Sequence, residues 1–361
     1  NSLVESRDLD SEWLHPLSDT CCIVSGMCAI VGYVGKSQAL PIGLDALKRM
    51  EYRGYDSAGI AVVEQGNIQV EKKEGKLDNL IGLVDEIGRE NITGTTCIGH
   101  TRWATHGRPN DVNAHPHQSF DGKVSIVHNG IIENFSTLRK EIEDAGIEMA
   151  SETDSEVAAH LLALAYNDGP TAGDFQASAL SVLRRLEGAY TVLFTHADHP
   201  GTIVAGRRST PLIVGVGEDE MFLGSDVAAF IAHTKHAVEL GQDNAVVITK
   251  DGYETMDFEG NPVEGKPFTI DWDLEAAQKD GFDSFMMKEI HEQPAAVRDT
   301  LGGHFVDGRI VLDEQRLSDD DLRGVEKVYV VACGSAYHSG LLAKYALSLI
   351  HISEPTRLGM I

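Results

Sequence analysis

The spacing of apolar and polar residues predicts many short strands with a few amphipathic helices between them. Alternating or continuously apolar runs are typical of strands, and they occupy residues 28–35, 59–64, 124–128, 191–195, 202–205, 212–216 and 245–249. Apolar residues at helical spacing predict helices over 42–50, 77–87, 134–145, 154–166 and 175–187. Short strands in meander order with few helices favour an α+β sandwich over a doubly wound parallel sheet.

This periodicity fades after residue 248, which indicates the end of a first domain. The following stretch contains Pro262, Pro267 and Pro294 and has no strong period. Because prolines in a stretch without regular apolar spacing are typical of connecting segments, we assign residues 28–248 to the first domain. Residues 249–317 then form a linker and the entry to a second domain.

A second, different pattern follows the linker. Residues 325–340 read as a buried strand, a small-residue loop and the start of a helix. Such a unit can open a phosphate site at the helix N-terminus, although any strand–helix unit looks similar. We assign residues 318–346 to a truncated α/β domain.

Both ends of the chain look foreign to the rest. Residues 1–26 show no clear period and no basic-led signal peptide, and Met27 already supplies a start. We therefore interpret residues 1–27 as an upstream extension, translated from upstream DNA rather than cleaved as a propeptide.

Residues 347–357 back-translate to a string that looks like a transposase-type sequencing adapter, so we expect residues 347–361 to be a translated adapter.

Composition narrows the classes of partner. The 361 residues include 30 basic and 56 acidic side chains, a formal charge of −26, which argues against nucleic acid or an anionic membrane as a partner. The 5 cysteines show no Cys-x-x-Cys pair, so they indicate neither a disulfide framework nor a zinc site. No apolar run approaches the roughly 20 residues that span a bilayer. We expect a reduced, cytoplasmic compartment.

Cys28 is the first candidate for chemistry, because it directly follows Met27. Removal of that methionine would give one residue a thiol and a free α-amine, whose pKa of roughly 7.7–8.0 suits a base near neutral pH. The alternative is a buried strand cysteine behind an ordinary internal Met. With residues 1–26 attached, the amine is an amide and the base is lost.

Five further motifs follow Cys28 in order. They are Glu51-Tyr-Arg-Gly-Tyr-Asp-Ser-Ala-Gly59, Gly99-His-Thr-Arg-Trp-Ala-Thr-His-Gly107, Asn113-Ala-His-Pro-His117, His128-Asn-Gly-Ile-Ile-Glu-Asn134 and Ser151-Glu-Thr-Asp-Ser-Glu156. This series resembles the glutaminase half of the glutamine–fructose-6-phosphate aminotransferases (isomerizing), from Cys28 to about Tyr345. The resemblance implies a four-layer αββα N-terminal-nucleophile fold and, in the second domain, the start of a sugar isomerase.

The same resemblance implies a catalytic set of Cys28, Asn129 and Gly130. The Cys28 thiolate would attack the side-chain amide of glutamine and form a glutamyl thioester. The side-chain amide of Asn129 and the backbone N–H of Gly130 would stabilise the oxyanion, where one donor contributes roughly 3–4 kcal/mol. For an isolated Asn-Gly pair, the alternative is a type I′ hairpin turn.

Glutamine binding is assigned in the same way. Arg102 would bind the α-carboxylate bidentately, and Asp154 would bind the α-ammonium unless it only caps a helix. Arg53 would lie close to the nucleophile, or else pair with Asp56. The closing loop and the gate for ammonia would be formed by Thr105, His106 and Trp103.

No cofactor or metal is implied. His115 and His117 are interpreted as packing or hydrogen-bonding side chains, because no carboxylate completes a set of ligands. The loop Cys333-Gly334-Ser335 would contact the sugar phosphate. The implied partners are L-glutamine and, for the full-length enzyme, fructose 6-phosphate and a second copy in a homodimer; a chain ending here would hydrolyse glutamine but make no glucosamine 6-phosphate.

One departure and two alternatives remain. The family usually has Gly where this chain has Ala29. If this position needs φ > 0 or close approach of the substrate, the Cβ of Ala29 would lower turnover. The variant Ala29→Gly should then be faster than the parent chain. Another amidotransferase of this class, such as the phosphoribosyl-pyrophosphate enzyme, would be expected to differ at Tyr52–Asp56 and Arg102–Thr105. A third hypothesis is a non-catalytic chain that binds glutamine while residues 1–26 mask Cys28.

Overall fold

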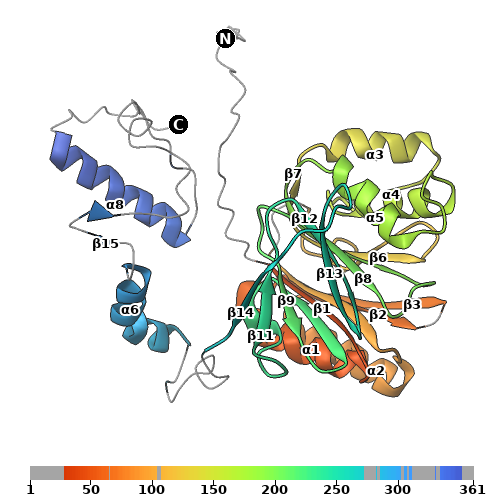
Figure 1. Ribbon diagram of the computed structural model, residues 1–361, viewed down its shortest axis with the longest axis horizontal. Coiled ribbons are helices and arrows are strands. Elements are labelled where there is room, and N and C mark those ends of the chain that lie inside the picture. Colours follow the sequence, from red (N-terminus) through yellow and green to blue (C-terminus); the bar gives the residue numbers. More distant parts are fainter. Residues whose placement is uncertain are drawn as a thin grey trace, which may run out of the picture. The chain divides into compact units, whose positions relative to one another are not determined.

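Two antiparallel β-sheets lie at the centre of the first part of the chain, and helices cover the outer face of each (Figure 1). The structure is a computed structural model that describes residues 28–64, 66–103, 107–271, 282, 285–301, 305–306, 309–310, 330 and 334–351. The chain divides between residues 281 and 282 into two units.

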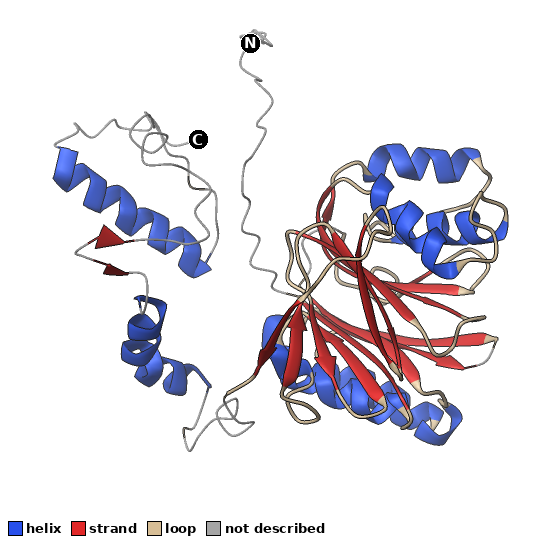
Figure 2. Cartoon of the chain, viewed as in Figure 1, coloured by secondary structure: helices blue, strands red, loops and turns tan. Residues whose placement is uncertain are grey.

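The first sheet carries the strand that follows Cys28. Its eight strands pair in the order β14-β11-β9-β10-β1-β4-β2-β3. Their bounds are β1 Ala29–Gly35, β2 Ser57–Glu64, β3 Asn67–Glu74, β4 Thr96–Arg102, β9 Ile213–Val216, β10 Glu220–Gly224, β11 His236–Glu239 and β14 Lys266–Thr269. Helices α1 (Ala39–Met50) and α2 (Leu77–Ile87) cover its outer face (Figure 2).

The second sheet carries the Asn-Gly pair. Its six strands pair in the order β13-β12-β8-β7-β6-β5. Their bounds are β5 His117–Gln118, β6 Val124–Ile132, β7 Gly188–His196, β8 Ile203–Arg208, β12 Asn244–Thr249 and β13 Gly252–Asp257. Three helices cover its outer face: α3 Phe135–Asp144, α4 Glu156–Asn167 and α5 Phe175–Arg185 (Figure 1).

Three hydrophobic cores hold these layers together. In β1, Val31 and Tyr33 pack into the core beneath α1 and α2, whereas Ile30 and Val34 pack between the two sheets. The alternation follows from the two-residue period of a strand, and both faces are covered, so all seven residues of β1 are buried. A third core lies between the second sheet and α3–α5. The four-layer αββα sandwich is thereby confirmed.

The predicted boundary at residue 248 was placed too early. Strand β13 pairs with β12 along its whole length, and β14 pairs with β11 from His236↔Thr269 to Glu239↔Lys266. All four residues of β14 are exposed. An edge strand of this kind has no apolar face, and periodicity therefore cannot detect it.

The second unit is described only in part. It contains α6 (Phe285–Leu301), the two-residue strands β15 (Phe305–Val306) and β16 (Arg309–Ile310), and α8 (Gly334–His351). The strand predicted at the start of residues 325–340 lies outside the described residues except at Val330. Within the described part of the chain, we find no helix whose length and apolar content would let it cross a membrane.

Candidate functional site

The thiol of Cys28 lies at the end of the first sheet, held by the strand beside it. β1 pairs with β4 at Ala29↔Thr101, which brings Cys28 to the chain that leaves β4. There the backbone N–H of Trp103 donates to the Cys28 Sγ at 3.2 Å, and Sγ lies 3.5 Å from the Trp103 carbonyl oxygen. The thiol is thus held by backbone atoms and is only partly exposed.

Burial is the main influence on the acidity of this thiol. It raises the pKa of Cys28 above the usual 9.0, while the Trp103 N–H and the charge of Arg102 act in the opposite direction. The charge of Asp56 raises the pKa further, and that of Arg53 lowers it. Because the balance is a raised pKa, Cys28 is protonated at neutral pH and needs a base to become a nucleophile.

Asn129 and Gly130 lie inside strand β6, so they do not form a hairpin turn. β6 pairs with β7 from Val124↔His196 to Ile132↔Gly188, without interruption at Gly130↔Tyr190. The Asn129 Nδ2 donates to the carbonyl oxygen of Cys28 at 3.1 Å. Strand β6 of the second sheet is therefore linked to Cys28, which directly precedes β1 of the first sheet.

Gly130 cannot carry a side chain at this point. Its φ is +118°, a region that L-residues rarely adopt. A Cβ would lie 2.0 Å from the Ala189 carbonyl oxygen on β7. The glycine therefore allows β6 and β7 to stay paired at this position.

Arg102 places a positive charge near the thiol, and the charge of Asp154 acts on Arg102. Arg102 is almost fully buried at the end of β4. Burial lowers its pKa, and the charges of Cys28, Asp154 and Asp56 raise it, so these groups interact. Asp154 accepts a hydrogen bond from the Ile132 backbone N–H at 2.8 Å, whereas Ser155 holds the N-cap position of α4.

Arg53 follows α1 in a short 3-10 turn, Glu51–Arg53. Its guanidinium donates to the Ser225 carbonyl oxygen at 3.0 Å and lies 3.8 Å from Asp226. The ion pair that the structure gives Arg53 is therefore with Asp226, although its charge still acts on Cys28. The ring of Trp103 meets Tyr55 edge to face at 5.3 Å.

A group of buried histidines lies behind the site. His115 packs against His100 and His117 with ring centroids 4.3 and 4.6 Å apart, and His117 contacts the Thr153 hydroxyl at 3.1 Å. Within the described residues, no group of three or more His, Cys, Asp or Glu could hold a metal ion.

The structure thus brings together seven of the predicted site residues: Cys28, Arg53, Arg102, Trp103, Asn129, Gly130 and Asp154. Thr105, His106 and Cys333 lie outside the described residues, and Gly334 and Ser335 begin α8. Ala29 is an extended residue of β1 and is not among the residues with positive φ, so backbone strain at this position is excluded.

Sequence reasoning missed His100, whose Nε2 lies 2.9 Å from the Asn129 Oδ1. It stands two residues before Arg102 in β4. Since residues i and i+2 of a strand share a face, this spacing could have assigned His100 to the site side of the strand.

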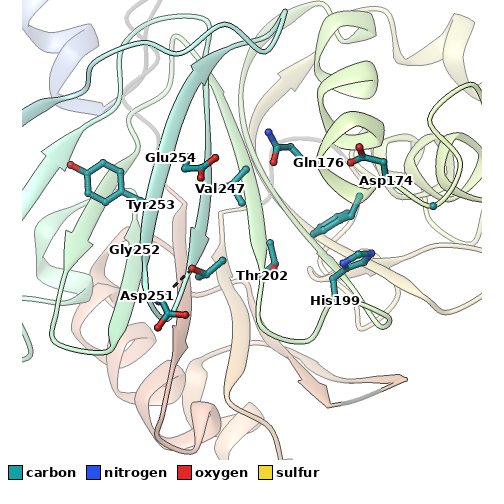
Figure 3. Close-up of a pocket in the computed structure, with 12 residues that line it drawn as sticks. Asp174, Gln176, His199, Thr202, Val247, Asp251, Gly252, Tyr253 and Glu254 are labelled. Carbon is teal, nitrogen blue, oxygen red and sulfur yellow. Dashed lines mark hydrogen bonds between the residues drawn. The ribbon is translucent and has the colours of Figure 1, made fainter.

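The first unit also contains two cavities that are lined by other residues. One of about 720 Å³ lies between α5, the β7–β8 turn and the β12–β13 hairpin (Figure 3). Asp174 and His199 point toward it from one side, and Glu254 from the other. Another, of about 460 Å³, has Lys72 and Glu156 in its wall. None of the predicted site residues lines either of these two cavities.

The chain is similar to a known domain and to several curated proteins. A family model described as "Glutamine amidotransferase domain" matches residues 100–232. The glutamine--fructose-6-phosphate aminotransferase (isomerizing) of Mycobacterium bovis is 64% identical over 326 residues, covering 89% of this chain and 52% of that protein. Proteins with the same name from Corynebacterium efficiens and Streptomyces coelicolor are each 53% identical, with the same coverage.

Solved structures share the fold. The glutamine phosphoribosylpyrophosphate amidotransferase of B. subtilis, complexed with ADP and GMP, superposes with a TM-score of 0.54 at 23% identity, covering 65% of this chain and 50% of that one. A structure described as the allosteric regulatory enzyme of purine biosynthesis gives 0.55 at 24% identity over the same shares. At such identities the likeness concerns the fold alone.

Proposed function

Because the chain belongs to the glutamine–fructose-6-phosphate aminotransferase family and spans 52% of the length of such a relative, we propose that it is the glutaminase half of this enzyme. Cys28 is its nucleophile once it is the N-terminal residue. The observation that carries the proposal is the convergence of the Cys28 thiol, the Trp103 N–H and the Asn129 amide.

The reaction is an amide hydrolysis in two steps. The α-amine of Cys28 takes the thiol proton while Sγ attacks the side-chain carbonyl carbon of glutamine. The C–N bond then breaks, the leaving nitrogen takes up the proton to depart as ammonia, and a glutamyl thioester remains on Cys28. Water attacks the thioester and releases glutamate.

Stabilisation of the oxyanion falls to Asn129 and Gly130. The Asn129 Nδ2 has two hydrogens, and one of them donates to the Cys28 carbonyl oxygen. The second hydrogen is free to donate to the developing charge, together with the Gly130 N–H. Donors fixed in advance contribute most, because they need no reorganisation during the reaction.

Recognition of free glutamine falls to Arg102 and Asp154. The buried guanidinium of Arg102 suits the α-carboxylate, and the Asp154 carboxylate suits the α-ammonium. The electrostatic interaction of Arg102 with both Asp154 and Cys28 supports this arrangement. Thr105 and His106 would close over the substrate, Trp103 would gate the ammonia, and Arg53 would hold a positive charge near the thiol.

The full-length activity goes further than this chain. In the complete enzyme the ammonia would be delivered to fructose 6-phosphate, bound in part by the loop Cys333-Gly334-Ser335, to give glucosamine 6-phosphate. We also propose that the full-length enzyme is a cytoplasmic homodimer. We further propose that it has neither nucleic acid nor a membrane as a partner, and the formal charge of −26 supports this second point.

The test is glutamate release from glutamine by a chain that begins at Met27, beside the 361-residue chain. We expect release from the shorter chain alone, its loss in Cys28→Ala, and its retention in Cys97→Ala, a matched variant at a fully buried cysteine. Release that survives Cys28→Ala would exclude this nucleophile. Equal release from both chains would exclude the α-amine as base, and no release from the shorter chain would leave only glutamine binding.

A further inference from the structure

We propose that His100 is a positioning residue of the glutaminase site: its Nε2–H holds the Asn129 carboxamide in the one orientation that presents an N–H to the oxyanion. This inference rests on the proposed function for its kinetic consequence. The contact itself, His100 Nε2 to Asn129 Oδ1 at 2.9 Å, does not depend on that function.

The orientation of the Asn129 amide follows from its two neighbours. The carbonyl oxygen of Cys28 can only accept a hydrogen bond, so the group that faces it at 3.1 Å must be the Asn129 Nδ2. The Asn129 oxygen therefore faces His100. Since that oxygen can only accept, the His100 Nε2 must carry the hydrogen.

A reversed amide would disable the oxyanion site. It would place Oδ1 against the Cys28 carbonyl oxygen and turn a lone pair, rather than an N–H, toward the developing negative charge. The Cys28 carbonyl alone does not prevent other rotations of the Asn129 side chain. The second contact, from His100, fixes both ends of the carboxamide.

His100 is itself held rigidly. It is buried in β4 at the position that pairs with Ile30 on β1 and with Gly59 on β2. The ring of His115 packs against it at 4.3 Å, and the His115 backbone lies so close to β2 that a Cβ on Gly59 would fall 2.1 Å from the His115 oxygen. The imidazole therefore has little freedom to leave Asn129.

His100 also keeps one protonation state over the working pH range. Burial, helped by the charges of Arg102 and His128, lowers its pKa to about 3, although the hydrogen bonds with Asn129 and with the His128 backbone act in the opposite direction. A neutral ring with hydrogen on Nε2 is a constant donor between pH 5 and 9, so His100 adds no titration of its own.

The kinetic test compares a variant that keeps the donor with one that removes it. The full chain is folded and then cut by a protease directly ahead of Cys28. His100→Leu should lower kcat about 10- to 100-fold through a misplaced oxyanion donor, with little change in the KM for glutamine. His100→Gln, whose amide nitrogen can occupy the place of Nε2, should recover most of the rate.

A double-mutant cycle separates positioning from general damage. If His100 acts through Asn129, adding His100→Leu to Asn129→Ala should lower kcat by less than twofold. A full further loss in the double variant, or a change in KM alone, would overturn the proposal. His196→Leu is the matched control: His196 is a buried histidine of β7 packed against Tyr166 at 3.9 Å, and its loss should leave kcat unchanged.

Nuclear magnetic resonance tests the contact on the intact chain, whether or not it hydrolyses glutamine. With ¹⁵N-labelled protein we expect His100 to show a hydrogen on Nε2 and none on Nδ1 between pH 5 and 8. The Asn129 side-chain amide should shift in His100→Leu but not in His196→Leu. An Nδ1–H tautomer, or an unmoved Asn129 amide, would overturn the proposal. An inactive parent chain with these signals present would instead refute the proposed function.

Discussion

Gly130→Ala tests whether the Asn-Gly pair depends on a backbone that only glycine can adopt. The substitution adds one methyl group at a φ of +118°. That methyl would lie 2.0 Å from the Ala189 carbonyl oxygen and 2.8 Å from the Tyr190 Cα, both on the neighbouring strand β7. Neither neighbour is a flexible side chain, so the backbone itself must move.

The magnitude follows from two contributions. A left-handed backbone costs an L-residue about 1–2 kcal/mol. Carbon–oxygen contacts between strands are normally about 3.3–3.6 Å, so β6 and β7 must separate by more than about 1 Å at Gly130↔Tyr190. Strands are held only about 4.7–4.9 Å apart, and the ladder hydrogen bonds there would be lost at about 1 kcal/mol each. We expect a loss of about 3 kcal/mol or more.

Gly122→Ala is the matched control. Gly122 also has a positive φ, +70°, but a Cβ there would meet nothing within 4 Å. It should therefore show the backbone contribution alone, about 1 kcal/mol. Urea unfolding followed by circular dichroism would give the free energy of unfolding of both variants, with equal slopes as the check for a common transition.

The rate of glutamate release provides a second measurement on the same two variants. Because Gly130→Ala also displaces the proposed oxyanion donors, it should lower kcat about 100-fold in the fraction that stays folded, whereas Gly122→Ala should leave kcat unchanged. Equal losses of stability in the two variants would refute the reasoning, since the contact with Ala189 would then contribute nothing.

Two further predictions concern titration. In the uncut chain, the rate at which iodoacetamide alkylates Cys28, followed by peptide mass spectrometry, should still rise above pH 9, because burial raises the pKa of that thiol. Cys97, with a pKa of about 12, should stay unreactive. A Cys28 rate that reaches a plateau below pH 9 would contradict this prediction. Burial raises the pKa of Glu156, but hydrogen bonds from His160 and Ser151 outweigh it and hold the value at about 2. Glu156→Gln should thus lower the unfolding free energy by about 2 kcal/mol at pH 7, and the difference should disappear as pH falls from 4.5 toward 2; a difference independent of pH would contradict it.

The sequence predicts the elements of the sandwich well where each has an apolar face. The helix predicted over 77–87 is observed with those bounds as α2, and that predicted over 134–145 is observed as α3, Phe135–Asp144. Both bury one face only, which is the pattern that periodicity detects. The order of strands in the sheets could not be predicted, because β1 pairs with β10 through contacts between residues far apart in the chain.

The site divides in a similar way. The charged residues proposed for the site, and Cys28, fall in or directly before long motifs, and the resemblance therefore predicts them. The role of His100 depends on Asn129, which stands 29 residues further along the chain. A buried histidine in a strand is common in cores, and nothing in its local sequence distinguishes a positioning residue from a packing one.

The electrostatics of the thiol explain why the residue ahead of Cys28 matters. Arg102 and Arg53 favour the thiolate, but burial and Asp56 oppose it and leave the pKa raised. Among the described groups around the thiol, the two guanidinium groups and the Trp103 backbone amide accept no proton at neutral pH, and the Asp56 carboxylate acts on the thiol as a charge that raises its pKa. His100 is engaged with Asn129 and has a pKa of about 3. An α-amine on Cys28 itself, with a pKa of roughly 7.7–8.0, can accept the thiol proton, and it is already close to the thiol because both groups belong to one residue. A peptide bond at that nitrogen removes the base but leaves Asn129, Arg102 and Asp154 in place. A chain with residues attached ahead of Cys28 should therefore still bind glutamine but fail to hydrolyse it.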